Sequence, residues 1–265
     1  MTGDKFRFRF AKSGTLRLVS HHDLMRCCER MLRRAAVPFK STNGFHPTPR
    51  LVFALSLPLG VIGRDEVVEL ELTEPRDGTA LLASLSGQAP AGLTFESVAP
   101  VPMKTTARVR RVVYALPLPP DRVPHVERAA AELRAEPKVW VERLRPSAKR
   151  LNIRPYLRNL SVANARLLLD LWVTQEGTAR ADELLDLLNL TDLVGDGAVL
   201  ERTTVELRDE IGPTEPTDVP PDGPSDSVPL TGAEVAALTA RLDEEANQQT
   251  VGADWGASPN GPVVE

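Results

Sequence analysis

Alternating polar and apolar positions near the start of the chain predict a β-strand. Residues 5–10 read Lys-Phe-Arg-Phe-Arg-Phe. Because side chains on a strand point alternately to opposite faces, the three phenylalanines share one face and the three basic residues share the other. We expect the phenylalanine face to contact the core and the basic face to form an outer row.

A helix is predicted from Ser20 to about Ala36, ahead of Pro38. Ser20 is a good N-cap residue, and Asp23 places a carboxylate in the positively polarised first turn. The spacing of three or four residues that places side chains on one helix face predicts an apolar face made of Leu24, Cys28, Met31 and Ala35. The same spacing predicts a second, basic face made of His22, Arg26, Arg30 and Arg33.

The pattern beyond this helix predicts an α+β fold. Strands are expected at residues 50–57, 66–72 and 93–98, with a helix at 77–85. The order β-α-β-β-α-β is that of a ferredoxin-like domain, and we assign it to residues 1–103. The same order is predicted again at residues 104–208, from strands at 110–116, 138–144, 166–173 and 199–207 and helices at 120–134 and 180–190. We therefore predict two tandem ferredoxin-like domains with antiparallel sheets.

The composition changes at Asp209. Residues 209–265 carry 12 Asp+Glu and one basic residue, Arg241, and are rich in proline. Such a segment buries too little apolar surface to offset the entropy of ordering it. We predict a disordered acidic tail, with a transient helix at residues 230–247.

Charge is distributed unevenly along the chain. Residues 1–160 hold 27 Lys+Arg against 15 Asp+Glu, a net charge of +12, whereas residues 161–265 hold 5 against 21, a net charge of −16. This asymmetry favours a body that binds polyanions and a tail that aids solubility. The alternative is an ordinary arginine-rich surface.

Several classes of protein are excluded by the composition. No apolar run approaches the roughly 20 residues of a membrane-spanning helix, and no apolar leader follows Met1, so we expect a cytoplasmic protein. The two cysteines, Cys27 and Cys28, are adjacent, which suits neither a mutual disulfide nor a zinc site. We expect reduced thiols, and neither a metal nor another cofactor.

The loop between the first helix and the next strand is the main candidate for ligand binding. It contains an Asn-Gly turn, and special loops serve function more often than packing. Together with the basic helix face, the residues expected to bind a ligand here are Lys40, Asn43, Gly44, Phe45, His46 and Arg50. Basic residues interleaved with an aromatic side chain add Arg154 and Tyr156 as a second candidate, for which an edge strand is the alternative.

The histidines allow an enzymatic alternative. If the start of the helix and the loop converge, His22 and His46 could act as acid and base on RNA without a metal. The alternative for both is a structural role in a helix cap or turn.

The N-terminal third resembles the radical-SAM-linked bacterial domain family, whose function is unknown. The resemblance rests on residues 20–26 (Ser-His-His-Asp-Leu-Met-Arg), Arg30, residues 33–35, residues 43–49, residues 57–60 and Glu66, and it extends over roughly residues 5–208. It implies association with a radical-SAM enzyme. Three closely spaced cysteines would be needed for the iron–sulfur cluster of such an enzyme, and this chain lacks them, so the enzyme would be a separate polypeptide.

Three hypotheses of function follow. The chain is either a non-catalytic accessory module that binds RNA, such as tRNA or rRNA, for a separate radical-SAM enzyme, or a metal-independent endoribonuclease that uses His22 or His46. The third alternative is a pure protein-interaction module with a basic face that binds an acidic partner.

Overall fold

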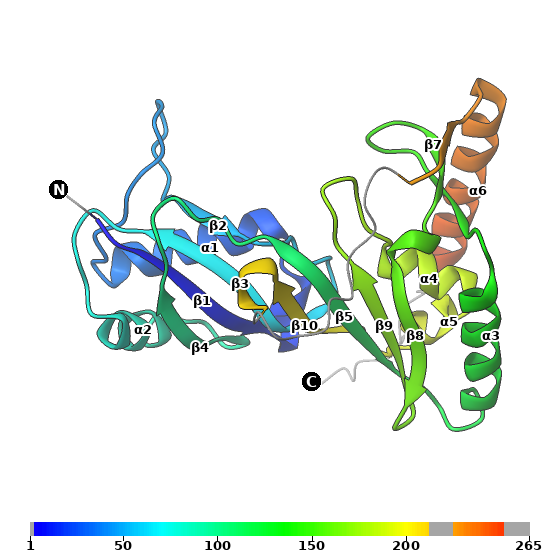
Figure 1. Ribbon diagram of the computed structural model, residues 1–265, viewed down its shortest axis with the longest axis horizontal. Coiled ribbons are helices and arrows are strands. Elements are labelled where there is room, and N and C mark those ends of the chain that lie inside the picture. Colours follow the sequence, from blue (N-terminus) through cyan, green and yellow to red (C-terminus); the bar gives the residue numbers. More distant parts are fainter. Residues whose placement is uncertain (1–2, 212–224, 252–265) are drawn as a thin grey trace, which may run out of the picture. The chain divides into compact units, whose positions relative to one another are not determined.

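The computed structural model describes residues 3–211 and 225–251 (Figure 1). The chain divides into two compact units. One comprises Met1–Val139 with Ile153–Pro224, and the other comprises Trp140–Asn152 with Ser225–Glu265. No helix in the described ranges combines the length and the apolar character needed to cross a membrane.

The first half of the larger unit has the predicted element order. It comprises β1 (Lys5–Lys12), η1 (Gly14–Leu18), α1 (His21–Arg34), β2 (Leu51–Phe53), β3 (Ile62–Glu71), α2 (Gly78–Ser86) and β4 (Leu93–Pro100). Its strands pair antiparallel in the order β4-β1-β3-β2. The three phenylalanines of β1 are buried with the apolar side chains of α1 and α2, as their alternation predicts.

Local signals in the sequence determine where α1 begins and which face it buries. The Ser20 side chain accepts a hydrogen bond from the Asp23 amide at 3.2 Å, which satisfies one of the free N–H groups of the first turn. Leu24, Cys28 and Met31 are buried, as predicted. The basic side chains of the helix therefore face away from the core.

The second half of the larger unit differs from the prediction in one strand. It comprises β5 (Val109–Pro117), α3 (Val123–Ala135), η2 (Arg154–Tyr156), β8 (Leu157–Ala163), β9 (Arg166–Trp172), α4 (Ala181–Leu187), α5 (Thr191–Gly195), β10 (Glu201–Leu207) and η3 (Arg208–Glu210). These strands pair in the order β10-β5-β9-β8. The strand predicted at residues 138–144 is not part of this sheet, and β8 occupies that place because Leu157 and Leu160 supply its buried face.

The two halves share one sheet. Strand β10 pairs antiparallel with β5 on one side and parallel with β3 on the other, through Glu201 with Ile62 and Arg202 with Gly63. The result is a mixed, mostly antiparallel sheet of eight strands. The α+β class is confirmed, whereas the arrangement as two tandem ferredoxin-like domains with separate sheets is not.

The smaller unit consists of a three-stranded sheet and a helix. Strands β6 (Trp140–Arg143), β7 (Lys149–Asn152) and β11 (Ser227–Pro229) pair antiparallel in the order β11-β7-β6, and α6 spans Gly232–Val251. The helix predicted at residues 230–247 is therefore present. The prediction of a disordered tail from Asp209 is wrong at η3 (Arg208–Glu210) and at β11, which is ordered because it pairs with β7. Residues 212–224 and 252–265 of the predicted tail lie outside the described residues.

Candidate functional site

The exposed face of α1 carries the predicted basic residues. His22, Arg26, Arg30 and Arg33 are all exposed. Two of them have acidic neighbours on the same helix, because Arg33 donates to Glu29 at 2.7 Å and Arg26 lies 3.4 Å from Asp23. Ion pairs in solvent contribute little and exchange readily, so these guanidinium groups remain available to an incoming anion. Arg30 forms no ion pair with any described residue.

The loop after α1 forms a narrow hairpin, which we call the finger (residues 41–49). Ser41 and Pro49 form an isolated β-bridge, and the Thr42 amide donates to the Thr48 carbonyl at 2.8 Å. Figure 1 shows the finger projecting from the ribbon near α1 and β2. Gly44, at φ 141°, allows the chain to reverse at the tip.

Phe45 lies at the tip of the finger and is fully exposed, with a relative accessibility of 102%. Asn43 and His46 beside it are also exposed. An isolated aromatic ring held in water on a projecting hairpin stabilises nothing within the chain. Its position therefore suits contact with another molecule rather than core packing.

The base of the finger is held by one carboxylate. Lys40 and Arg50, which flank the finger, contact the Glu71 side chain of β3 at 3.2 and 3.1 Å. Burial acts to raise the pKa of Glu71, but hydrogen bonds from Arg50 and Lys40 outweigh it and hold that pKa below its usual value. These two cations are thus partly neutralised by the protein itself.

The helix face and the base of the finger line a common hollow. A depression of about 130 Å³ is lined by His22, Arg26 and Glu29 of α1 and by Thr48 and Pro49 of the finger, among others. The predicted convergence of the helix start with the loop is therefore present at His22. His46 does not line this hollow, so the structure does not bring the two histidines together there.

His21, next to His22, has a structural role. Its ring packs edge-on against Phe53 of β2, with 5.1 Å between the ring centroids. Burial, with smaller contributions from His22 and Lys12, lowers the pKa of His21. We expect this imidazole to be neutral at pH 7 and to fix the start of α1 on the sheet.

The second predicted segment, around Arg154 and Tyr156, is not presented as expected. Tyr156 is 1% exposed, so its ring cannot stack on a base. Arg154 donates to the backbone carbonyls of Arg134, Glu136 and Leu157 at 2.9–3.2 Å. The sequence pattern is that of a basic surface. It does not reveal that, in η2, Arg154 binds backbone carbonyls and Tyr156 is buried.

The outer basic row predicted on β1 is also covered. Lys5 and Arg7 are buried, and both contact the fully buried Glu69 of β3. Arg7 further binds Asp209, and Arg9 binds Glu210, both in η3. Part of the positive charge of the N-terminal region is thus neutralised internally, whereas the arginines of α1 remain exposed.

The described residues offer no metal site. No group of three or more His, Cys, Asp or Glu in residues 3–211 and 225–251 is arranged to hold an ion. Both cysteines are free thiols, and burial raises the pKa of Cys28 to about 12. Cys28 is therefore an inert core residue rather than a ligand or nucleophile.

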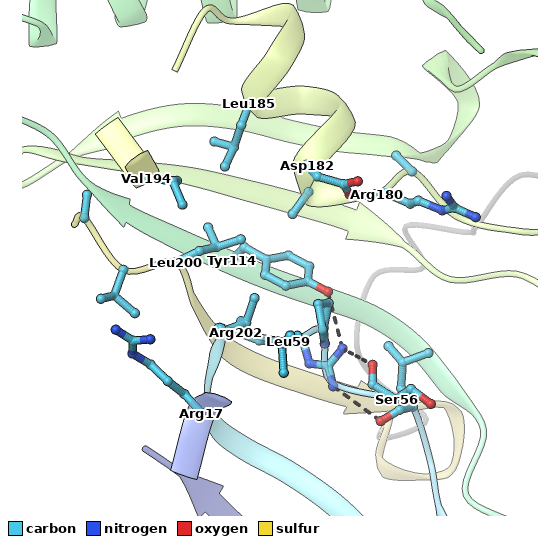
Figure 2. A pocket seen from close by; sticks show the side chains of 18 of the residues that line it. Arg17, Ser56, Leu59, Tyr114, Arg180, Asp182, Leu185, Val194, Leu200 and Arg202 are labelled. Atoms are coloured by element: carbon cyan, nitrogen blue, oxygen red, sulfur yellow. Dashed lines mark hydrogen bonds between the residues drawn. The ribbon is translucent and has the colours of Figure 1, made fainter. Parts of the chain in front are cut away.

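Sequence reasoning missed a larger cavity of about 640 Å³ in the larger unit (Figure 2). On one side it is bounded by a buried ion pair, in which Arg202 of β10 donates to both carboxylate oxygens of Glu66 on β3, at 2.8 and 2.5 Å. Burial opposes the charge on Arg202, but the hydrogen bonds that it donates to Glu66 and Tyr114 raise its pKa above the usual value. These residues are 136 positions apart in the sequence, and no local pattern links them.

Comparisons with known proteins provide a family and little else. A family model described as "Uncharacterized protein conserved in bacteria (DUF2344)" matches residues 5–182. No curated protein matches the sequence. Among solved structures, a crystal structure of an unknown protein from Galdieria sulphuraria is similar with a TM-score of 0.26 and 11% identity, covering 78% of this chain and 99% of that chain.

Proposed function

The chain belongs to the DUF2344 family of uncharacterized proteins conserved in bacteria, and from this premise we propose that it is a non-catalytic accessory module that binds RNA. The observation that carries the proposal is the exposed Phe45 at the tip of the finger, beside a basic helix face. Single-stranded RNA is bound by aromatic rings that stack on bases and by cations that contact phosphates.

The site divides the work between two elements. Phe45 stacks on an unpaired base, while Asn43 and His46 offer polar groups at the same tip. On α1, Arg26, Arg30 and Arg33 contact the phosphates. His22 lines the hollow between α1 and the base of the finger. A loop or bulge in a folded RNA such as tRNA or rRNA presents both features together.

A separate radical-SAM enzyme is the proposed partner. The support is the resemblance of residues 20–66 to the radical-SAM-linked family, together with the lack of three closely spaced cysteines in this chain. On this proposal the chain holds the RNA, and the partner carries out the modification. We also retain the ferredoxin-like assignment of each half as a proposal, since the first half has the strand order β4-β1-β3-β2 and the second has β10-β5-β9-β8.

Fluorescence anisotropy with a labelled RNA stem-loop, measured over a salt series, tests RNA binding. Base–aromatic stacking contributes about 1–3 kcal/mol per base, so Phe45→Ala should raise Kd by about 5- to 150-fold. Arg30→Gln should weaken binding and reduce the dependence of log K on log salt concentration. The matched control is Arg128→Gln, which removes the same charge from the exposed face of α3 and should leave Kd unchanged.

The other two hypotheses are distinguished by the same material. RNA that is cleaved by the wild type, but not by His46→Ala or His22→Ala, would identify a ribonuclease instead of an accessory module. An RNA affinity too weak to measure even at low salt would refute RNA binding and leave a module that binds an acidic protein.

A further inference from the structure

The cavity of about 640 Å³ has the size and the lining of a small-molecule site. It lies between the segment that precedes β3 and the residues of α4, α5 and the start of β10 (Figure 2). Small-molecule sites in proteins typically measure about 300–1,000 Å³ and are mostly apolar, with a few polar groups that orient the ligand. None of the residues proposed for RNA binding lines it.

The walls of the cavity are aliphatic. Leu59 and Val194 reach it from opposite sides and are 67% and 43% exposed, although both are large apolar side chains. Leu185 and Leu200 extend this surface inwards and are buried. A ligand with an apolar body would remove Leu59 and Val194 from water, which is favourable.

Most polar groups in the cavity wall are already engaged. Arg202 donates to Glu66, to the carbonyls of Leu55 and Ser56, and to the Tyr114 hydroxyl at 3.3 Å. Because the Tyr114 oxygen accepts this bond, its own hydrogen remains available to a ligand. The wall around Arg202 thus offers the neutral Tyr114 hydroxyl as a donor, while the Arg202 cation is already paired.

A free positive charge is available at one end of the cavity. The guanidinium group of Arg17 forms no ion pair or side-chain hydrogen bond with any described residue, yet it lines the cavity. Arg180 and Asp182 line the other side, so a group of each sign is present there (Figure 2). An anionic group is therefore favoured at Arg17, with the aliphatic walls beyond it.

We propose that this cavity binds an amphiphilic anion, in which an aliphatic chain lies against Leu59, Val194 and Leu185 and a carboxylate or phosphate head group binds Arg17. The two head groups share the required chemistry, and separate ligands distinguish them. The site is independent of the finger and of RNA binding.

Calorimetric titration of the full-length chain with monomeric decanoate and with decyl phosphate tests the proposal, with decanol as the uncharged control. We expect at least one anion to bind, and decanol to bind more weakly. Loss of a charge-assisted hydrogen bond should raise the Kd of that anion about tenfold in Arg17→Gln. Val194→Trp, which fills the cavity from an exposed position, should abolish binding, and Arg26→Gln on the exposed face of α1 should not change it.

Several results would overturn the proposal. The proposal is wrong if neither anion binds. It is also wrong if Arg17→Gln and Val194→Trp bind the anion as the wild type does while circular dichroism and melting show that both variants are folded. Equal affinity for decanol would exclude the role of Arg17. RNA binding measured on the same samples separates the two proposals, because Arg17→Gln should keep the RNA affinity that Phe45→Ala loses.

Discussion

Removing one partner of the buried ion pair between β3 and β10 should destabilise the larger unit severely. Glu66 and Arg202 have side chains that are 3% and 1% exposed, and the carboxylate receives two hydrogen bonds from the guanidinium group. Glu66→Gln preserves the size of the side chain and removes its charge. Arg202 then stays buried as a cation without a counter-charge, a situation that costs about 3–5 kcal/mol.

This magnitude is large relative to the stability of a domain. Unfolding free energies are typically about 5–15 kcal/mol, so a cost of about 3–5 kcal/mol in Glu66→Gln should remove about a fifth or more of the total. The effect falls on the junction of the two halves, because Arg202 is one of only two residues through which β10 pairs with β3. The matched control is Glu74→Gln, whose partner Arg76 lies 3.9 Å away in solvent and which should cost at most about 1 kcal/mol.

Urea unfolding, followed by circular dichroism and by the fluorescence of the buried Trp172, provides the measurement. The double variant Glu66→Leu with Arg202→Met removes both charges, and we expect it to be more stable than Glu66→Gln. A cost below about 1 kcal/mol for Glu66→Gln would refute the argument. The argument would also be refuted if the double variant lost as much stability as the sum of the losses from its two substitutions made singly, because additive losses mean that the two residues do not interact.

Three further outcomes follow from the described contacts. In the native protein a thiol reagent should modify Cys27 but not Cys28, whose pKa is raised to about 12, and urea should expose both. The hydrogen bond from Arg7 lowers the pKa of Asp209 in the folded protein below its usual value. The stability that Asp209 contributes is therefore present above the usual pKa and is lost as the pH falls through the folded-state pKa. Asp209→Asn should make the free energy of unfolding fall less steeply with decreasing pH in this acid range. Ser20→Ala removes the N-cap of α1 and should cost about 1 kcal/mol in the same urea assay.

Each of these expectations has a contrary result. Equal reaction rates of the two thiols would show that Cys28 is accessible. If the stability of Asp209→Asn falls at low pH as it does in the wild type, Asp209 does not contribute to the pH dependence of stability. A Ser20→Ala variant as stable as the wild type would show that other groups satisfy the amide of the first turn.

Local periodicity predicted the first half of the fold well. The alternation of β1 and the capped, amphipathic α1 depend on neighbouring residues alone, so Phe8 and Met31 could be placed in the core from the sequence. The same reasoning could not tell that the basic face of β1 is covered. Alternation shows that two faces differ in polarity, but it does not show that Glu69 and η3 lie against the polar one.

Strand pairing over long separations was beyond the sequence. Residues 140–143 and 157–163 both form strands, and only the pairing of β8 with β9 decides which of them enters the large sheet. Likewise, the sequence indicated a binding loop at Asn43-Gly44, but the projection of Phe45 from the body is visible only in the structure. The cavity above Arg202 depends on contacts between the two halves, so it left no local signal.

The position of β10 also bears on how the protein is made. This strand lies between β3 and β5 in the sheet, yet it is the last of the eight strands to leave the ribosome. Until it does, β5 and the N-terminal end of β3 expose backbone groups that can pair with a strand of another nascent chain. Synthesis stalled before Glu201 should therefore yield an aggregation-prone chain in which the strands of both halves are present but not joined. Release of β10 then joins them into one continuous sheet.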